Sequence, residues 1–194
     1  MDNRKEREMI YFVRHGESEA NKNMSEGGLF SFEEHYDAPL TEKGKEQARE
    51  TAEVLKDKSI DIVVTSGLLR AIETGKIING KHEAPMLEMV DLNEREDRRE
   101  GVGDGMKGWN ESFDFDYDAN PSIEKLEEFK DRVVRAIEEI KVKYGDKDVL
   151  VVAHGGVSHV FRRYFSGRPW EGNIREVKMK NAEVVSFEFE EENK

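Results

Sequence analysis

The strongest constraint on the fold is an apolar run near the start of the chain that ends abruptly in charged and flexible residues. Residues 9–13 are five apolar or aromatic residues in succession, which is typical of a strand buried on both faces. Arg14-His15-Gly16-Glu17 follows without a gap. Because open α/β sheets bind ligands at the carboxyl ends of their strands, this pattern predicts a buried strand with polar chemistry at its end.

Strand-like runs and amphipathic helices alternate along the rest of the chain. The expected strands after the first are residues 60–66, 86–92, 148–153 and 183–190, and the expected helices start at Thr41, Leu68, Asn120 and Val157. Such alternation predicts a three-layer α/β/α sandwich with a mostly parallel sheet. Residues 183–190 alternate apolar and polar side chains, as expected of an edge strand at the C-terminus.

Two stretches interrupt this alternation. Residues 19–38 are expected to be a loop that forms part of a pocket wall. Residues 95–120 contain glycines and charge clusters without long helical or strand periodicity, and we expect a lid insertion there. A length of 194 residues suits one domain with a sizeable core, so a single domain is predicted over residues 1–194.

Composition narrows the possible partners. The formal net charge is −12, which argues against a nucleic acid or an anionic membrane as a partner. No cysteine is present, which excludes disulfides and a thiolate nucleophile. No apolar run is long enough for a signal peptide or a membrane span, so a soluble cytoplasmic protein is expected. Nothing in the sequence indicates the oligomeric state.

Polar side chains capable of chemistry follow several of the predicted strands. They fall in four places: Arg14-His15-Gly16-Glu17, the stretch 66–74 with Arg70, Asn93-Glu94, and His154-Gly155. Because parallel strands end at the same edge of a sheet, we expect two imidazoles and at least one guanidinium to meet in one crevice.

The order of these motifs resembles that of the histidine phosphatase superfamily, which includes the cofactor-dependent phosphoglycerate mutases. The matching motifs are Arg14-His15-Gly16-Glu17-Ser18 with Asn21, Leu40-Thr41-x-x-Gly44-x-x-Gln47-Ala48, Ser66-x-Leu68-x-Arg70-Ala71-x-x-Thr74, Leu92-Asn93-Glu94-Arg95, His154-Gly155-Gly156 and Asn181-Ala182. They cover nearly the whole chain in family order, and the lid insertion is the one sizeable part without a match.

The resemblance implies phosphoryl transfer through a phosphohistidine, and simple chemistry supports each role. A neutral imidazole can attack phosphorus, and His15 is the candidate nucleophile because it follows a rigid strand. The planar guanidinium groups of Arg14 and Arg70 match the oxygens of a phosphoryl group. His154 would donate a hydrogen bond to the same oxygens, helped by the helix that starts after it.

Three further roles complete the predicted site. The backbone amide of Gly155 and the side chain of Asn21 would donate to the phosphate. The resemblance assigns proton transfer to Glu94, which would protonate the leaving alkoxide and then take a proton from the attacking water. Neither a metal ion nor a cofactor is expected in this mechanism.

The predicted function is that of a metal-independent phosphatase acting on a small phosphorylated metabolite. A phosphoglycerate mutase dependent on 2,3-bisphosphoglycerate is the alternative, and it would need a basic lid that excludes water. Residues 95–128 carry more acids than bases, although Arg98 and Arg99 could hold a second anionic group. A non-catalytic module that binds a phosphorylated ligand would require a broken site, whereas all the expected residues are present. No motif names the substrate.

Overall fold

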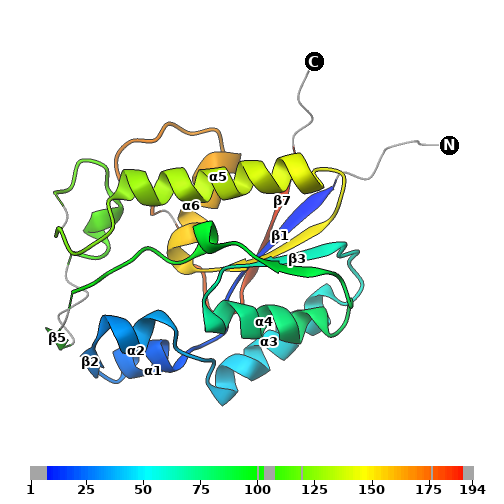
Figure 1. The fold of residues 1–194 in the computed structure, drawn as a ribbon, viewed down its shortest axis with the longest axis horizontal. Coiled ribbons are helices and arrows are strands. Elements are labelled where there is room, and N and C mark those ends of the chain that lie inside the picture. Colours follow the sequence, from blue (N-terminus) through cyan, green and yellow to red (C-terminus); the bar gives the residue numbers. More distant parts are fainter. Residues whose placement is uncertain (1–7, 100, 103–107, 119, 176, 190–194) are drawn as a thin grey trace.

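A five-stranded sheet lies at the centre of the computed structural model, which describes residues 8–99, 101–102, 108–118, 120–175 and 177–189 (Figure 1). Its strand order is β4-β3-β6-β1-β7. The strands are β1 (Met9–Arg14), β3 (Ile62–Thr65), β4 (Met86–Glu88), β6 (Val149–Ala153) and β7 (Val184–Glu188). Strands β4, β3, β6 and β1 are parallel, and β7 pairs with β1 in the antiparallel sense at the edge. The predicted edge strand is confirmed.

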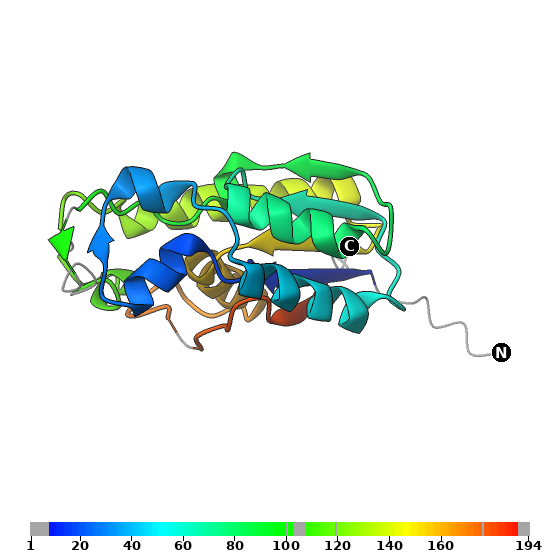
Figure 2. The same ribbon diagram turned by 90° about the horizontal axis from the view of Figure 1, so that it is seen from below.

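Helices cover both faces of this sheet, as Figures 1 and 2 show. Alternate residues of β6 point to opposite faces: Leu150 and Val152 belong to one apolar cluster, Val149 and Val151 to the other. The first cluster includes residues of α3 (Glu42–Leu55) and α4 (Leu69–Asn79), and the second those of α5 (Leu126–Tyr144) and α6 (Gly155–Phe165). The three-layer α/β/α architecture is therefore confirmed.

The prediction of a loop over residues 19–38 is wrong. This stretch contains α1 (Glu19–Ser25), β2 (Leu29–Phe30) and α2 (Phe32–Tyr36). Ser18 caps α1 by accepting a hydrogen bond from the Asn21 amide, while the Asn21 side chain accepts one from the Ser18 amide. Both helices are too short to show a clear periodicity in the sequence. They lie beyond the carboxyl end of β1 (Figure 1).

The long helix α5 also begins later than predicted. The Asn120 side chain accepts from the Ser122 amide and so closes a turn, not a helix. Residues 122–124 then run beside residues 96–98: the Arg98 amide donates to the Ser122 carbonyl, and the Glu124 amide donates to the Glu96 carbonyl. This pairing between distant segments holds the backbone extended, and the helix starts at Leu126.

The predicted strand over residues 86–92 is shorter in the structure. Strand β4 ends at Glu88, and the 3₁₀ helix η1 (Val90–Leu92) follows it. Glu94 therefore comes after a helical turn and not directly after a strand.

The described part of the lid insertion is firmly anchored. Phe113 of the 3₁₀ helix η3 (Glu111–Phe113) is 1% exposed and belongs to the core beneath α5 and α6. Arg95 donates to the carbonyl and hydroxyl oxygens of Ser112, at 2.6 and 3.0 Å. Strand β5 (Gly101–Val102) pairs with β2, whereas residues 100, 103–107 and 119 of the predicted lid lie outside the described residues. None of the described helices is both long and apolar enough to cross a membrane.

Candidate active site

The pairing of β1 with β6 brings His15 and His154 together. Arg14 lies opposite Ala153 in this parallel pair, so the residue after each strand reaches the same edge of the sheet. The His15 amide donates to the Ala153 carbonyl at 2.9 Å, and the two imidazole rings are 5.0 Å apart between centroids. The meeting of the two histidines, expected from the strand ends, is thus present in the structure.

The surroundings of His15 define which of its nitrogens can react. Nδ1 lies 2.7 Å from the Gly16 carbonyl, an acceptor, so Nδ1 carries the proton and donates it. Nε2 is then the nitrogen with a lone pair, and it accepts from Nε of Arg70 at 3.3 Å. Burial, followed by the charges of Arg70 and Arg14, holds the pKa of His15 well below 6.5. His15 is therefore neutral near pH 7.

Two desolvated guanidinium groups lie next to this imidazole. Arg70, on α4, is 7% exposed and donates to the Tyr36 carbonyl at 2.7 Å. Burial lowers its pKa to about 10, so it stays charged near neutral pH. Arg14 donates to the Met179 carbonyl at 2.6 Å, and its buried Nε has no hydrogen-bond partner among the described residues. An anion bound between these groups would compensate for the solvation they have lost.

His154 is fully buried and is oriented by Ser66. The Ser66 hydroxyl oxygen accepts from the Leu68 amide at 3.3 Å and lies 2.7 Å from Nε2 of His154. The hydroxyl group donates its own proton to Nε2, so Nε2 is the acceptor of the neutral ring. The ring proton of His154 therefore lies on Nδ1. That Nδ1 is buried without a partner in the part of the chain that the structure describes. Burial, Arg70 and His15 keep the pKa of His154 well below 6.5.

Glu94 lies over the start of α6. One of its carboxylate oxygens accepts from the Gly156 amide and the other from the Arg95 amide, both at 3.0 Å. A Cβ atom at Gly156 would come within 2.2 Å of the Glu94 carboxylate, so only glycine allows this contact. The second glycine of the His154-Gly155-Gly156 motif thereby has a direct steric reason.

An arginine without a role in the sequence analysis positions Glu94. Arg132, on α5, donates to the carbonyl oxygens of Asp91, Asn93 and Glu94 at 2.7 to 3.1 Å. Glu124 in turn accepts two hydrogen bonds from the same guanidinium, at 2.7 and 2.8 Å. In sequence Arg132 looks like any arginine beside the apolar stripe of a helix, because the carbonyl groups that it binds lie about 40 residues away. Ser66 was likewise part of a motif but had no predicted role.

The loop after β1 is held by the motif around Gly44. A Cβ at Gly44 would lie 2.0 Å from the Glu17 carbonyl oxygen, so the loop and α3 approach closely only because this residue is glycine. Gln47 accepts from the Glu17 amide at 2.8 Å, and Thr74 accepts from the Gly16 amide at 3.0 Å. These contacts fix the backbone that carries His15.

Asn21 and Gly155 complete the set of predicted site residues. The Asn21 side-chain oxygen accepts from Asn181, whose amide nitrogen also lies 3.2 Å from the His15 carbonyl. Gly155 is the first residue of α6 and lies against Arg14, with 3.6 Å between its ideal Cβ position and Arg14 Nε.

A cavity of about 1140 Å³ opens above these residues. Six of the seven predicted site residues line it: Arg14, His15, Asn21, Arg70, Glu94 and Gly155. His154 lies beneath its floor, fully buried. Aromatic side chains from α2 and from the lid insertion also line the cavity, namely Phe32, Tyr36, Trp109 and Phe113. The arrangement is a buried, positively charged floor under a partly aromatic wall.

Arg98 and Arg99, considered as ligands for a second anion, are engaged elsewhere. Arg98 forms an ion pair with Glu96 at 2.7 Å. Arg99 donates to both carboxylate oxygens of Asp97. Neither arginine lines the cavity above His15.

Comparisons with known proteins agree with this geometry. Residues 10–194 match the model of the histidine phosphatase superfamily (branch 1). The chain is 36% identical over 183 residues to the protein named uncharacterized phosphatase PhoE of Bacillus subtilis, covering 94% of this chain and 89% of that one. It is 35% identical over 167 residues to a 2,3-bisphosphoglycerate-dependent phosphoglycerate mutase of Parvibaculum lavamentivorans, covering 76% and 74%. The structure of the alpha-ribazole phosphatase from Shigella flexneri superposes with a TM-score of 0.74 at 27% identity, covering 92% and 89%.

Proposed function

The chain belongs to the histidine phosphatase superfamily, branch 1, and from this premise we propose that it hydrolyses a small phosphomonoester through a phosphohistidine at His15. One observation carries the proposal. The Gly16 carbonyl holds the proton of His15 on Nδ1, and the lone pair of Nε2 then lies beside the Arg70 guanidinium. A neutral nucleophile next to a desolvated cation is the arrangement that attack on a phosphate dianion requires.

In the first step, Nε2 of His15 attacks phosphorus and the P–O bond to the leaving group breaks. Arg14, Arg70 and the Nδ1 proton of His154 would hold the non-bridging oxygens, together with the Gly155 amide at the start of α6 and Asn21. Glu94 would donate a proton to the leaving alkoxide. Arg14 Nε and His154 Nδ1 are buried and have no partner among the described residues, and they support this assignment because a phosphoryl group would satisfy both.

In the second step, water attacks the phosphohistidine, and the bond between Nε2 and phosphorus breaks. Glu94 would take the proton from that water and so return to the state from which it started. Its place at the cavity, fixed by Arg132 through three carbonyl oxygens, supports this role.

Hydrolysis is favoured over transfer to a second sugar acid. A mutase needs a basic lid that closes over the substrate and excludes water. Arg98 and Arg99 pair with neighbouring carboxylates instead. The relatives include both a named phosphatase and a named mutase at nearly equal identity, 36% and 35%, so the choice rests on the site.

The test is phosphate release from a panel of phosphomonoesters in the presence of EDTA, with 2-phosphoglycerate formation from 3-phosphoglycerate followed in the same samples. We expect release that resists the chelator and no isomer. Isomer formation that rises with added 2,3-bisphosphoglycerate would identify a mutase. Loss of release on chelation, restored by a metal, would overturn the metal-independent mechanism.

A further inference from the structure

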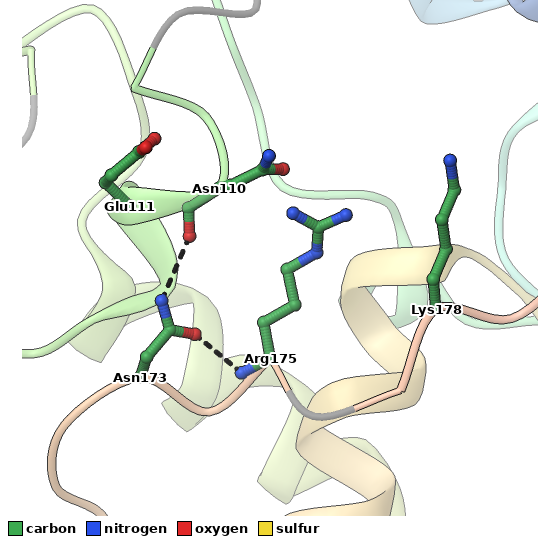
Figure 3. Close-up of a pocket in the computed structure, with 5 residues that line it drawn as sticks. All are labelled: Asn110, Glu111, Asn173, Arg175 and Lys178. Atoms are coloured by element: carbon green, nitrogen blue, oxygen red, sulfur yellow. Dashed lines mark hydrogen bonds between the residues drawn. The ribbon is translucent and has the colours of Figure 1, made fainter.

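A second, smaller cavity of about 320 Å³ adjoins the one above His15. Asn110, Arg175 and Lys178 line both cavities, and Glu111 and Asn173 complete the smaller one (Figure 3). None of these residues belongs to the phosphate site described above. The extension therefore offers room, next to the proposed reacting centre, for the part of a substrate that lies beyond its phosphate.

Two cations and one carboxylate line this extension. Arg175 and Lys178 come from one segment before β7, and Figure 3 shows their side chains pointing toward the same opening. Glu111 lies on the other side of Asn110 in that view. Within the described ranges, no carboxylate oxygen lies within ion-pair distance of either cation.

Two of the carboxylates that line the larger cavity are already paired. Glu17 lies 2.7 Å from Lys43, and Asp97 is paired with Arg99. The charges of Arg175 and Lys178 are therefore not cancelled by these two carboxylates, and the pair can attract an anion.

The segment that carries Arg175 is held rigidly against the lid insertion. Asn173 donates to the Asn110 carbonyl at 3.2 Å and accepts from the Arg175 amide at 2.8 Å. The Ile174 amide donates to the Phe113 carbonyl at 2.9 Å. These bonds fix the backbone of Arg175 before any ligand binds, which lowers the entropic cost of binding.

The same segment reaches the phosphate site. Met179, the neighbour of Lys178, accepts a hydrogen bond from the Arg14 guanidinium at 2.6 Å. Arg175 also acts electrostatically inside the larger cavity: after burial, its charge is the next cause that lowers the pKa of His159, a residue of the cavity wall. A single substrate could thus contact both cationic sites.

We propose that Arg175 and Lys178 bind a second anionic group of the substrate. The substrate class is then a phosphomonoester that also carries a carboxylate or a second phosphate. This inference rests on the proposed function, because the phosphate to be cleaved must lie at His15. Arg175 and Lys178 would determine specificity and take no part in the chemistry.

Matched substrate pairs test the proposal. 3-Phosphoglycerate and glycerol 3-phosphate differ in a carboxylate, and glucose 1,6-bisphosphate and glucose 6-phosphate differ in a second phosphate. We expect kcat/KM to favour the anionic member of at least one pair by about tenfold or more, as hydrogen bonds to charged groups allow. In the double variant R175Q/K178Q that ratio should fall toward one, while Arg175→Lys should retain most of it.

The control variant R49Q/K56Q makes the same charge changes at two exposed residues, one on α3 and one at its C-cap, outside both cavities. It should keep the wild-type ratio. A ratio near one for both pairs in the wild type, or a ratio that R175Q/K178Q leaves intact, would overturn the second anion site. Phosphate release from neither member of any pair, nor from p-nitrophenyl phosphate, would instead refute the proposed function. Circular dichroism of each variant shows whether it is folded.

Discussion

The protonation state of His15, the proposed nucleophile, depends on contacts with its immediate neighbours. The Gly16 carbonyl selects the tautomer, and burial with Arg70 and Arg14 keeps the pKa well below 6.5. A protonated imidazole has no lone pair to attack phosphorus, so a nucleophilic histidine must stay neutral. The cations that would bind the phosphate also keep His15 neutral.

Replacing His15 by alanine should abolish turnover without unfolding the protein. We expect kcat to fall by about 10⁴-fold or more, because no other side chain can take over as the nucleophile. Rapid acid-free quenching of wild-type enzyme with a ³²P-labelled ester should trap a label that is stable to alkali and lost in acid. A label of equal size in His15→Ala would contradict the assignment.

For Glu94, the expected effect depends on the leaving group. Glu94→Gln removes the proton that an alkoxide needs, so kcat/KM for an alkyl phosphate should fall by about 10² to 10⁴. p-Nitrophenolate leaves without protonation, so phosphorylation of the enzyme by p-nitrophenyl phosphate should fall much less. Burst kinetics compares the phosphorylation step with the two leaving groups. Equal losses with both leaving groups would exclude Glu94 as the acid.

His159 should make the protein sensitive to acid. Burial, then Arg175 and Arg162, lowers its pKa to about 4, whereas an unfolded histidine titrates near 6.5. As the pH falls from 6.5 to 4, the unfolded chain binds a proton that the folded chain does not. The free energy of unfolding then drops by about 1.4 kcal/mol per pH unit, or about 3 kcal/mol at pH 4.

Urea unfolding of wild type and His159→Gln between pH 8 and pH 4 measures this contribution. Above pH 7 the difference between the two proteins should be constant, since His159 is neutral in both states. Below pH 6.5 the variant should lose stability more slowly. His15 and His154 also have lowered pKa values and remain in both proteins, so some acid sensitivity persists in the variant. Parallel curves would contradict the prediction.

Among the helices and loops, the contact between α3 and the loop after β1 limits what the site tolerates. Gly44 and Gly16 let the two backbones approach so closely that a Cβ at either would clash, at 2.0 and 2.4 Å from a carbonyl oxygen. The loop cannot move aside freely, because Gln47 and Thr74 bind its amides. The packing of α3 against this loop therefore also determines the position of His15.

Gly44→Ala should lower both stability and activity. Overpacking against a held backbone costs about 2 kcal/mol or more, and any shift of the loop displaces His15. Gly80→Ala is the matched control: Gly80 ends α4 with φ −59°, and its nearest neighbour lies 3.4 Å from the new Cβ. It should be neutral or stabilising by up to about 1 kcal/mol. Chemical denaturation and kcat of both variants decide the matter; equal effects would refute the steric argument.

For the molecule as a whole, the proposed phosphate site lies where β1, β6 and the starts of α4 and α6 converge. An anion that bridges Arg14, Arg70 and His154 links three distant parts of the chain. Such a ligand binds the folded state alone, so it should stabilise the entire fold and not only the loop after β1.

Inorganic phosphate should raise Tm in proportion to its affinity. At about 100 times Kd the gain is about 2.7 kcal/mol, or roughly 5 to 10 °C for a chain of this size. Arg70→Gln should lose most of the shift, whereas R49Q/K56Q should keep it. Differential scanning calorimetry at fixed ionic strength, with sulfate-free buffer, makes the comparison. A full shift in Arg70→Gln would place the anion elsewhere.

The sequence alone determined the layers, the sheet and the residues that meet at its edge. Buried strands are apolar runs, and the polar residues that follow them are visible without knowledge of the fold. Since parallel strands must end at one edge, the proximity of His15, Arg14 and His154 followed from their positions along the chain. Arg70, Glu94 and Gly155 also follow predicted strands, and the family motifs added Asn21.

Only the tertiary structure decided the features that depend on contacts between distant segments. The pairing of residues 122–124 with 96–98 delays α5, and Arg132 holds Glu94 through carbonyl oxygens about 40 residues away. Helices α1 and α2 escape prediction because one or two turns show too little periodicity. Arg175 and Lys178 line the cavity because their segment lies beside the lid insertion in the fold. A local sequence pattern indicates which residues are buried. Hydrogen bonds and charge interactions between distant segments depend instead on how the whole chain folds.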